Sequence, residues 1–184
     1  MEKTRYSTPS RLFHWGMALL ILLTIPAGLL MVQPGIDRGL QNGLFLYHKN
    51  VGVLLLVLVV ARLIWRWRHP APKLPGDLPA LQAIAAKVSH GLLYTLMVVV
   101  PLAGYVRVRA GGFPVESLDA LGIATLVPRS DALAEIAKSF HYFAGLAIIA
   151  VLALHIGAAL YHRFVRRDGI FERMWPPFGG NGRP

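Results

Sequence analysis

The chain has 184 residues, of which 55% are hydrophobic and 15% are charged, and its formal net charge is +10. Soluble domains contain about 25% charged residues, so this composition indicates a protein that is surrounded by lipid. The absence of cysteine excludes disulfides, iron–sulfur clusters, thiolate zinc sites and covalent c-type haem attachment. The basic residues lie between apolar runs rather than on one soluble face, which argues against nucleic acid as a partner.

Four apolar runs follow one another along the chain, at about residues 12–32, 46–67, 86–106 and 139–162. A run of about 20 residues is long enough to cross a hydrocarbon core about 30 Å thick as a helix. Inside lipid every backbone polar group needs an internal partner, which favours helices. The expected fold class is therefore all-α: an integral membrane four-helix bundle, with residues 1–184 forming a single domain.

The first run also has the basic start of a cleaved signal peptide. However, it is long, contains Pro26, and ends at Gln33-Pro34-Gly35 without a small-x-small cleavage site. We therefore expect an uncleaved first helix.

The three links differ in composition. Residues 33–45 form a short link, residues 68–85 are rich in proline, and residues 107–138 form the longest link. Within the last, residues 131–138 are expected to be helical, with Ser130 or Asp131 as the cap.

The distribution of Lys and Arg predicts the orientation of the bundle. Thirteen cations belong to the side with the N-terminus, the second link and the C-terminal tail, and six belong to the other side. Cytoplasmic loops carry the excess of positive charge, so both termini are expected in the cytoplasm. The thirteen are Lys3, Arg5, Arg11, Arg62, Arg66, Arg68, Lys73, Lys87, Arg163, Arg166, Arg167, Arg173 and Arg183.

Histidines recur at the ends of the expected helices, and ionisable residues within membrane spans indicate a function. His14 and His155 fall toward the cytoplasmic side, on the first and fourth helices, whereas His48 and His141 fall toward the outer side, on the second and fourth. Facing imidazoles at one depth suit the two axial positions of a haem iron. The sequence thus predicts two b haems, ligated by His14 with His155 and by His48 with His141.

The spacing along the fourth helix supports this arrangement. His141 and His155 are fourteen residues apart, which at about 100° and 1.5 Å per residue puts them on nearly one face and about 21 Å apart. A histidine at a helix end can instead be a headgroup anchor. That alternative fits His69, His90 and His162 well, and it fits His14, His48 and His141 when each is taken alone. It fits His155 poorly, because this residue lies deep in an apolar stretch.

The same spacing of fourteen residues recurs on the other helices. Gly28 lies fourteen residues after His14, Arg62 lies fourteen after His48, and Gly104 lies fourteen after His90. A glycine lets a flat haem approach the backbone, and Arg62 can pair with haem propionates. The alternative for the glycines is that this residue is common in membrane helices.

Together these residues make the chain resemble the bacterial cytochrome b561 family over nearly its whole length. In that family the axial ligands lie on helices one, two and four, with two on helix four, which implies His14, His48, His141 and His155. The resemblance also implies a location in the inner membrane of a bacterium and electron transfer coupled to quinone. Short members include superoxide oxidases, which pass an electron from superoxide to ubiquinone. The motifs concerned are Arg11-Leu12-Phe13-His14-Trp15, Leu46-Tyr47-His48-Lys49-Asn50-Val51-Gly52, Arg62-Leu63-Ile64-Trp65-Arg66, Ser89-His90-Gly91-Leu92-Leu93-Tyr94, Pro101-Leu102-Ala103-Gly104, Phe140-His141-Tyr142 and residues 154–162.

The leading functional hypothesis is therefore a superoxide:ubiquinone oxidoreductase. Lys138 and Arg107, with Lys49, Arg109 and Arg129, are expected to form a cationic funnel that steers superoxide to the outer haem. The alternative is that these are solvated loop charges, offset by Asp37, Glu116, Asp119, Asp131 and Glu135.

Ubiquinone is expected near the inner haem, where cytoplasmic protons are available. The candidate residues lie near that level, and their alternative role is to bind haem propionates. For the two histidines among them, a further alternative is a role as interfacial anchors. They are His90, His162, Ser10, Arg11 and Tyr94.

Two other functions compete with this hypothesis. One is an electron-transfer cytochrome b subunit, which would link a partner dehydrogenase or another donor to the quinone pool. The other is a non-redox membrane protein, such as an assembly factor or transporter, and a haem absorption spectrum distinguishes it.

Overall fold

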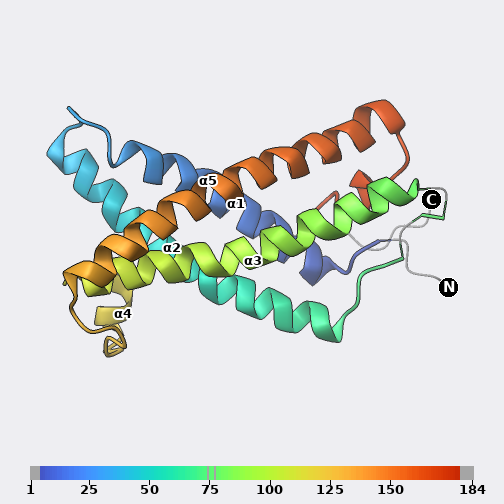
Figure 1. Cartoon of the computed structure of the whole chain (residues 1–184). Coiled ribbons are helices and arrows are strands. Elements are labelled where there is room, and N and C mark those ends of the chain that lie inside the picture. The colour runs from blue at the N-terminus through green and yellow to red at the C-terminus, as the bar shows by residue number, and fades with distance from the viewer. Residues whose placement is uncertain (1–4, 74, 77, 179–184) are drawn as a thin grey trace.

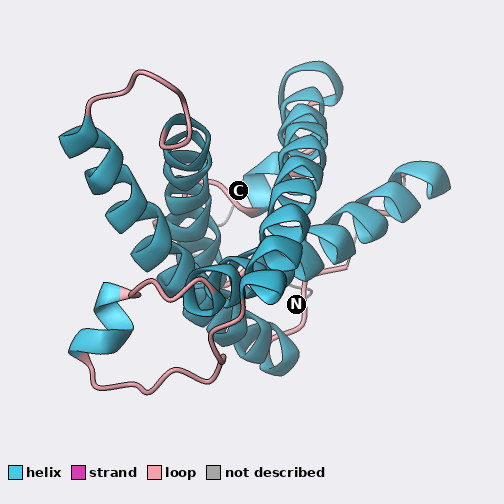
Figure 2. Cartoon of the chain, turned by 60° about the vertical axis from the view of Figure 1, so that its left-hand side comes forward, coloured by secondary structure: helices cyan, strands magenta, loops and turns pink. Residues whose placement is uncertain are grey.

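The computed structural model describes residues 5–73, 75, 76 and 78–178, and four long helices dominate it (Figure 1). They are α1 (Thr8–Leu30), α2 (Arg38–Arg68), α3 (Ala80–Ala110) and α5 (Asp131–Tyr161). The shorter elements are α4 (Glu116–Ala120), the π-helical turn η1 (His162–Arg166) and the 3-10 turn η2 (Phe171–Arg173). Figure 2 shows helices and loops without a strand in this part of the chain, which confirms the all-α class.

All four long helices are long and apolar enough to cross a membrane, as expected. Their bounds nevertheless differ from the predicted ones. For example, α2 and α3 each have 31 residues, or about 46 Å at 1.5 Å per residue. The apolar run marks only the part that suits a hydrocarbon core of about 30 Å. The helices α2 and α3 therefore continue beyond both ends of their runs, whereas α1 and α5 extend beyond theirs only at the N-terminal end.

Two of the long helices begin at capping side chains. Asp37 accepts a hydrogen bond from the Leu40 N–H at the start of α2, and Ser130 accepts one from the Leu133 N–H at the start of α5. Such caps satisfy backbone donors that lack a partner within the helix. The expected helical entry at residues 131–138, with Ser130 as its cap, is confirmed.

The helices are arranged so that α3 packs most closely on α5, α1 packs on α2, and α2 packs on α3 (Figure 1). Many apolar side chains point outward instead of into the bundle, among them Leu19, Val57 and Leu154. An apolar outer surface of this extent suits lipid rather than water.

One end of the bundle joins the N-terminal segment, the link between α2 and α3, and the C-terminal segment. The Tyr6 N–H donates to the Arg173 carbonyl, and the Arg173 guanidinium donates to the carbonyls of Pro72 and Lys73. The fully buried Arg11 donates to the Pro176 carbonyl at 2.9 Å. The segments that carry most of the basic residues thus meet at one end. Lys3 and Arg183, which belong to the same predicted side, lie outside the described residues.

At the opposite end, the link that contains α4 is attached to α2. Lys49 forms an ion pair with Glu116 at 2.6 Å, and Asn50 donates to the same carboxylate at 2.9 Å. The Asn50 side-chain oxygen accepts from the Ser117 N–H at 2.7 Å. The sequence analysis did not predict α4, and these contacts fix its position.

The Glu116 contacts predict a pH dependence of stability. Burial raises the pKa of Glu116, but hydrogen bonds from Lys49, its own N–H and Asn50 outweigh burial and hold the pKa below its ordinary value of 4.5. A carboxyl whose pKa is lowered by folding stabilises the folded chain above pH 4.5, and this contribution is lost as the pH falls through the folded-state pKa. The thermal midpoint of detergent-solubilised protein should therefore fall on acidification, and less steeply in Glu116→Gln.

The matched control for this measurement is Glu135→Gln. Glu135 is 70% exposed and pairs with the exposed Lys138, so its ion pair contributes little. Equal acid slopes for wild type and Glu116→Gln would show that the Glu116 contacts do not stabilise the link.

Candidate functional site

Four histidines meet in two facing pairs within the helix bundle. His14 on α1 and His155 on α5 form the α1–α5 pair, with ring centroids 6.2 Å apart. His48 on α2 and His141 on α5 form the α2–α5 pair, with ring centroids 6.0 Å apart. Both pairs therefore use α5, and each draws its second ring from a different helix.

The spacing of the rings suits a metal ion between them. A metal–imidazole bond is about 2 Å long, so two rings on opposite sides of one ion have centroids roughly 6 Å apart. Imidazole is also a ligand that iron accepts in haem proteins. The donor sets fit haem iron in both pairs, and the ligand role of the four histidines stays a prediction.

Hydrogen bonds orient the two rings of the α2–α5 pair. Nδ1 of His48 lies 3.0 Å from the Thr24 carbonyl oxygen, and Nδ1 of His141 lies 2.9 Å from the Val100 carbonyl oxygen. A carbonyl oxygen only accepts, so in both rings Nδ1 carries the proton and donates it. Nε2 is then left with its lone pair, which is the state that binds a metal.

Each of these rings lies against a glycine. A Cβ added to Gly28 would stand 2.5 Å from Cε1 of His48, and one added to Gly104 would stand 3.0 Å from Cε1 of His141. The two glycines thus make room for imidazole rings at the level of the α2–α5 pair. The expected contact of Gly28 and Gly104 with haem itself stays a prediction.

Around the α1–α5 pair the prominent charge is Arg62 of α2, which acts electrostatically on both His14 and His155. Arg62 and Arg66 both lie over the ring of Tyr94, at 5.5 Å and 5.6 Å from its centroid. These residues line a small pocket with Ser10, whose hydroxyl accepts a hydrogen bond from the Trp65 indole, and with Trp65 and His69. Neither guanidinium forms an ion pair with a carboxylate among the described residues, so this pocket has a positive character.

The other candidates for quinone binding lie in separate places. The ring of His90 is 5.4 Å from that of His155, so it adjoins the α1–α5 pair. Nδ1 of His162 is 2.6 Å from the Asp168 carboxylate, and neither residue lines the Arg62 pocket. Arg11 holds the C-terminal segment through Pro176. The structure thus brings Ser10 and Tyr94 together, with His90 beside the histidine pair, but not His162 or Arg11.

Asp168, which the sequence analysis did not single out, is the partner of His162. Burial raises the pKa of Asp168, but hydrogen bonds from His162 and the Ile170 N–H, with the nearby charge of Arg166, outweigh burial and lower it. An acidic residue in a predicted tail gives no sequence signal of such a contact.

The predicted outer cations behave differently from one another. Lys49, Arg109 and Lys138 each pair with a carboxylate, from Glu116, Asp119 and Glu135 respectively. Arg107 acts electrostatically on both His48 and His141, and no carboxylate partner is found for it in the described part of the chain. The expected offset by acidic residues therefore applies to three of the five cations, and Arg107 is the one whose charge acts on the histidines.

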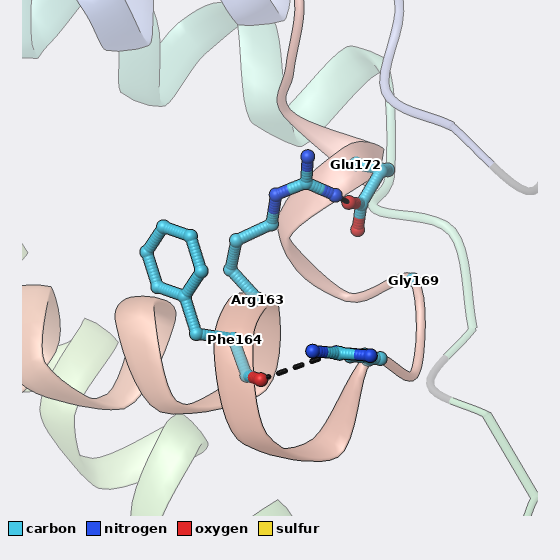
Figure 3. Close-up of a pocket in the computed structure, with 5 residues that line it drawn as sticks. Arg163, Phe164, Gly169 and Glu172 are labelled. Atoms are coloured by element: carbon cyan, nitrogen blue, oxygen red, sulfur yellow. Dashed lines mark hydrogen bonds and ion pairs between the residues drawn. The ribbon is translucent and has the colours of Figure 1, made fainter.

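A larger cavity lies at the C-terminal end of α5, with a volume of about 340 Å³ (Figure 3). Arg163, Phe164, Arg167, Gly169 and Glu172 line it, and Arg163 is paired with Glu172. None of the four paired histidines lines this cavity, so it is a separate feature.

The chain is similar in sequence to known proteins over nearly its whole length. A family model described as prokaryotic cytochrome b561 matches residues 5–177. Cytochrome b561 homolog 2 of Escherichia coli (strain K12) is 28% identical over 173 residues, which is 92% of this chain and 90% of that protein. Cytochrome b561 homolog 1 of the same strain is 28% identical over 177 residues, with 94% and 97% covered. A Yersinia pestis protein named probable superoxide oxidase CybB is 27% identical over 177 residues, with 94% and 96% covered.

Proposed function

The chain belongs to the prokaryotic cytochrome b561 family, and we propose that it passes electrons from superoxide to ubiquinone through two b haems. The family match and the four spans make it a bacterial membrane protein for electron transfer that binds b-type haem in a lipid environment. The choice of superoxide is supported by the name of the Yersinia pestis relative and by the charge near the α2–α5 pair.

We assign one haem to each histidine pair. The α1–α5 pair would hold one iron through His14 and His155, and the α2–α5 pair would hold the other through His48 and His141. A haem iron supplies reversible one-electron chemistry when it is bound. Arg62 lies where a cation can pair with the propionates of the haem at the α1–α5 pair.

The orientation follows from the charges at the two ends. The end that joins the N-terminal, second-link and C-terminal segments has most of the cations, so it is proposed to face the cytoplasm, with the inner membrane as the location. The α1–α5 pair is then the inner pair, and the α2–α5 pair is the outer pair.

The observation that carries the proposed donor is the electrostatic effect of Arg107 on both rings of the α2–α5 pair. A guanidinium beside the outer pair attracts an anion to the place where an electron must enter. Each superoxide gives up one electron and leaves as dioxygen. Two such electrons, with two protons, convert one ubiquinone into ubiquinol.

The proposed acceptor site lies at the inner end. Arg62 lines the small pocket together with Ser10 and Tyr94, and His90 adjoins the inner pair. A histidine there can donate a hydrogen bond to a quinone carbonyl and then transfer a proton from the cytoplasmic side.

The test is a stopped-flow measurement on purified protein with superoxide and a water-soluble ubiquinone analogue. Superoxide should reduce the haems, and the quinone should then reoxidise them with formation of quinol. Haems that superoxide leaves oxidised, although a chemical reductant reduces them and quinone reoxidises them, would favour a partner dehydrogenase as the donor.

The quinone site predicts a difference between two histidine variants. His90→Ala should slow reoxidation of the pre-reduced protein by quinone at least about tenfold, the scale of a lost proton donor. His162→Ala should have a smaller effect, because His162 is held by Asp168 away from the Arg62 pocket. Haem content is measured in both variants. Unchanged reoxidation in both, with two haems retained, would move the quinone site elsewhere.

A further inference from the structure

The two histidine pairs differ in the hydrogen bonds that the Nδ1 atoms of their rings make. Both rings of the α2–α5 pair donate Nδ1–H to a backbone carbonyl, at 3.0 Å and 2.9 Å. By contrast, Nδ1 of His14 is buried and unpartnered, and His155 makes no ring hydrogen bond within the described residues. One pair therefore has two such bonds and the other has none.

The two bonds are built in the same way on two different helices. Thr24 lies four residues before Gly28, and Val100 lies four residues before Gly104. A carbonyl oxygen has two lone pairs, so it accepts the imidazole as well as its own helical bond. The ring reaches that oxygen only because the following turn has no side chain, since a Cβ at either glycine would meet Cε1 at 3.0 Å or less.

A hydrogen bond from Nδ1–H to an acceptor makes the imidazole a more basic ligand. A more basic ligand stabilises the oxidised state of iron relative to the reduced state, and second-shell hydrogen bonds are one of the ways by which a protein sets a haem potential. The hydrogen bonds of His48 and His141 should therefore lower the reduction potential of a haem held by that pair.

Nearby charges do not cancel this difference. Arg107 acts on both rings of the α2–α5 pair, and Arg62 acts on both rings of the α1–α5 pair. Arg66 is a second cation near the α1–α5 pair. Its charge acts on His90, whose ring is 5.4 Å from that of His155. A positive charge disfavours the oxidised, more positive state, so the cations favour a higher potential at the α1–α5 pair, or at least an equal one.

We propose that Gly28 and Gly104 are positioning residues, which hold His48 and His141 on the Thr24 and Val100 carbonyls and thereby keep the outer haem at a lower reduction potential than the inner haem. This proposal rests on the proposed ligand assignment. An electron that a one-electron donor delivers at the outer pair then moves to the inner pair without an input of energy. The two glycines thus help to set the direction of transfer.

The experiment is a spectroelectrochemical redox titration of the haem-loaded protein and of two variants, Gly28→Ala and Gly104→Ala. Wild type should titrate in two steps. Protein with His155→Ala, which keeps only the outer haem, should titrate at the lower of them. In each glycine variant the lower step should rise while the upper step stays in place. The expected size is at least a tenfold change in the equilibrium constant for electron transfer between the haems, which is about 59 mV for one electron.

The matched controls are Gly16→Ala and Gly91→Ala, on the same two helices. A Cβ at either position meets nothing within 4 Å, so both steps should stay in place. The added Cβ of Gly28→Ala lies closer to its imidazole ring than that of Gly104→Ala, so this variant can lose a haem. In that case Gly104→Ala tests the proposal, because a smaller shift of the His141 ring relieves its contact.

Two sets of results would overturn the proposal, and haem content separates them. Two haems per chain in wild type and Gly104→Ala, with unchanged potentials or with the outer haem at the higher potential, would refute the tuning and leave the ligand assignment intact. One haem per chain in wild type would refute the ligand assignment, and the tuning with it.

Discussion

Replacing His155 with alanine should reduce the haem content from two per chain to one and leave the remaining haem low-spin. The reason is that α5 supplies one ring to each pair, and His155 faces only the α1–α5 pair, at 6.2 Å from His14. The α2–α5 pair, with its own carbonyl hydrogen bonds, does not depend on that ring. Pyridine haemochrome analysis measures the content, and electron transfer from superoxide to quinone should be abolished.

Two further variants identify the partner of His155. His90 is also close to this ring, at 5.4 Å, so His14→Ala and His90→Ala are compared directly. We expect the first to lose one haem and the second to keep both. The opposite outcome would assign the ligand role to His90. His69→Ala is the control, because His69 stacks on Trp65 and belongs to neither pair, so both haems should remain.

The sequence was sufficient for the four spans and for the facing pairs. Apolar runs near twenty residues determine helices in lipid, and the topology then fixes the depth of each histidine. The fourteen-residue step between His141 and His155 puts both on one face of α5, and each does face a ring from another helix. Hydropathy was insufficient for the helix ends, because α2 begins at Arg38, well before its apolar run at about residue 46.

The contacts around the histidine pairs could not be predicted from the sequence, because they depend on how helices and loops come together. A backbone carbonyl such as that of Thr24 gives no residue-type signal as a hydrogen-bond acceptor. The fourteen-residue step did single out Gly28 and Gly104, whose contact with haem stays a prediction, but it did not indicate that each lies against an imidazole ring. Likewise, counting outer cations could not show that Lys138 is paired with Glu135 while the charge of Arg107 acts on His48 and His141.

This difference between the two outer cations leads to the second large expected effect. Arg107→Glu should lower the rate of haem reduction by superoxide about tenfold or more, the scale of electrostatic steering into a charged site. Lys138→Glu makes the same change in net charge, but Lys138 is 53% exposed and pairs with Glu135, so its effect should be several times smaller. Stopped-flow reduction at fixed superoxide concentration gives both rates.

The salt dependence separates steering from a change in the haem itself. Screening shortens the field of an exposed charge to about 8 Å at physiological ionic strength, so the wild-type rate should fall as salt rises. In Arg107→Glu the attraction is replaced by repulsion, so added salt should leave the rate unchanged or raise it. A shift in reduction potential alone would slow the variant equally at every salt concentration. Equal effects of the two charge reversals would instead mean that superoxide responds to the net charge of the outer face, and Arg107 would lose its special role.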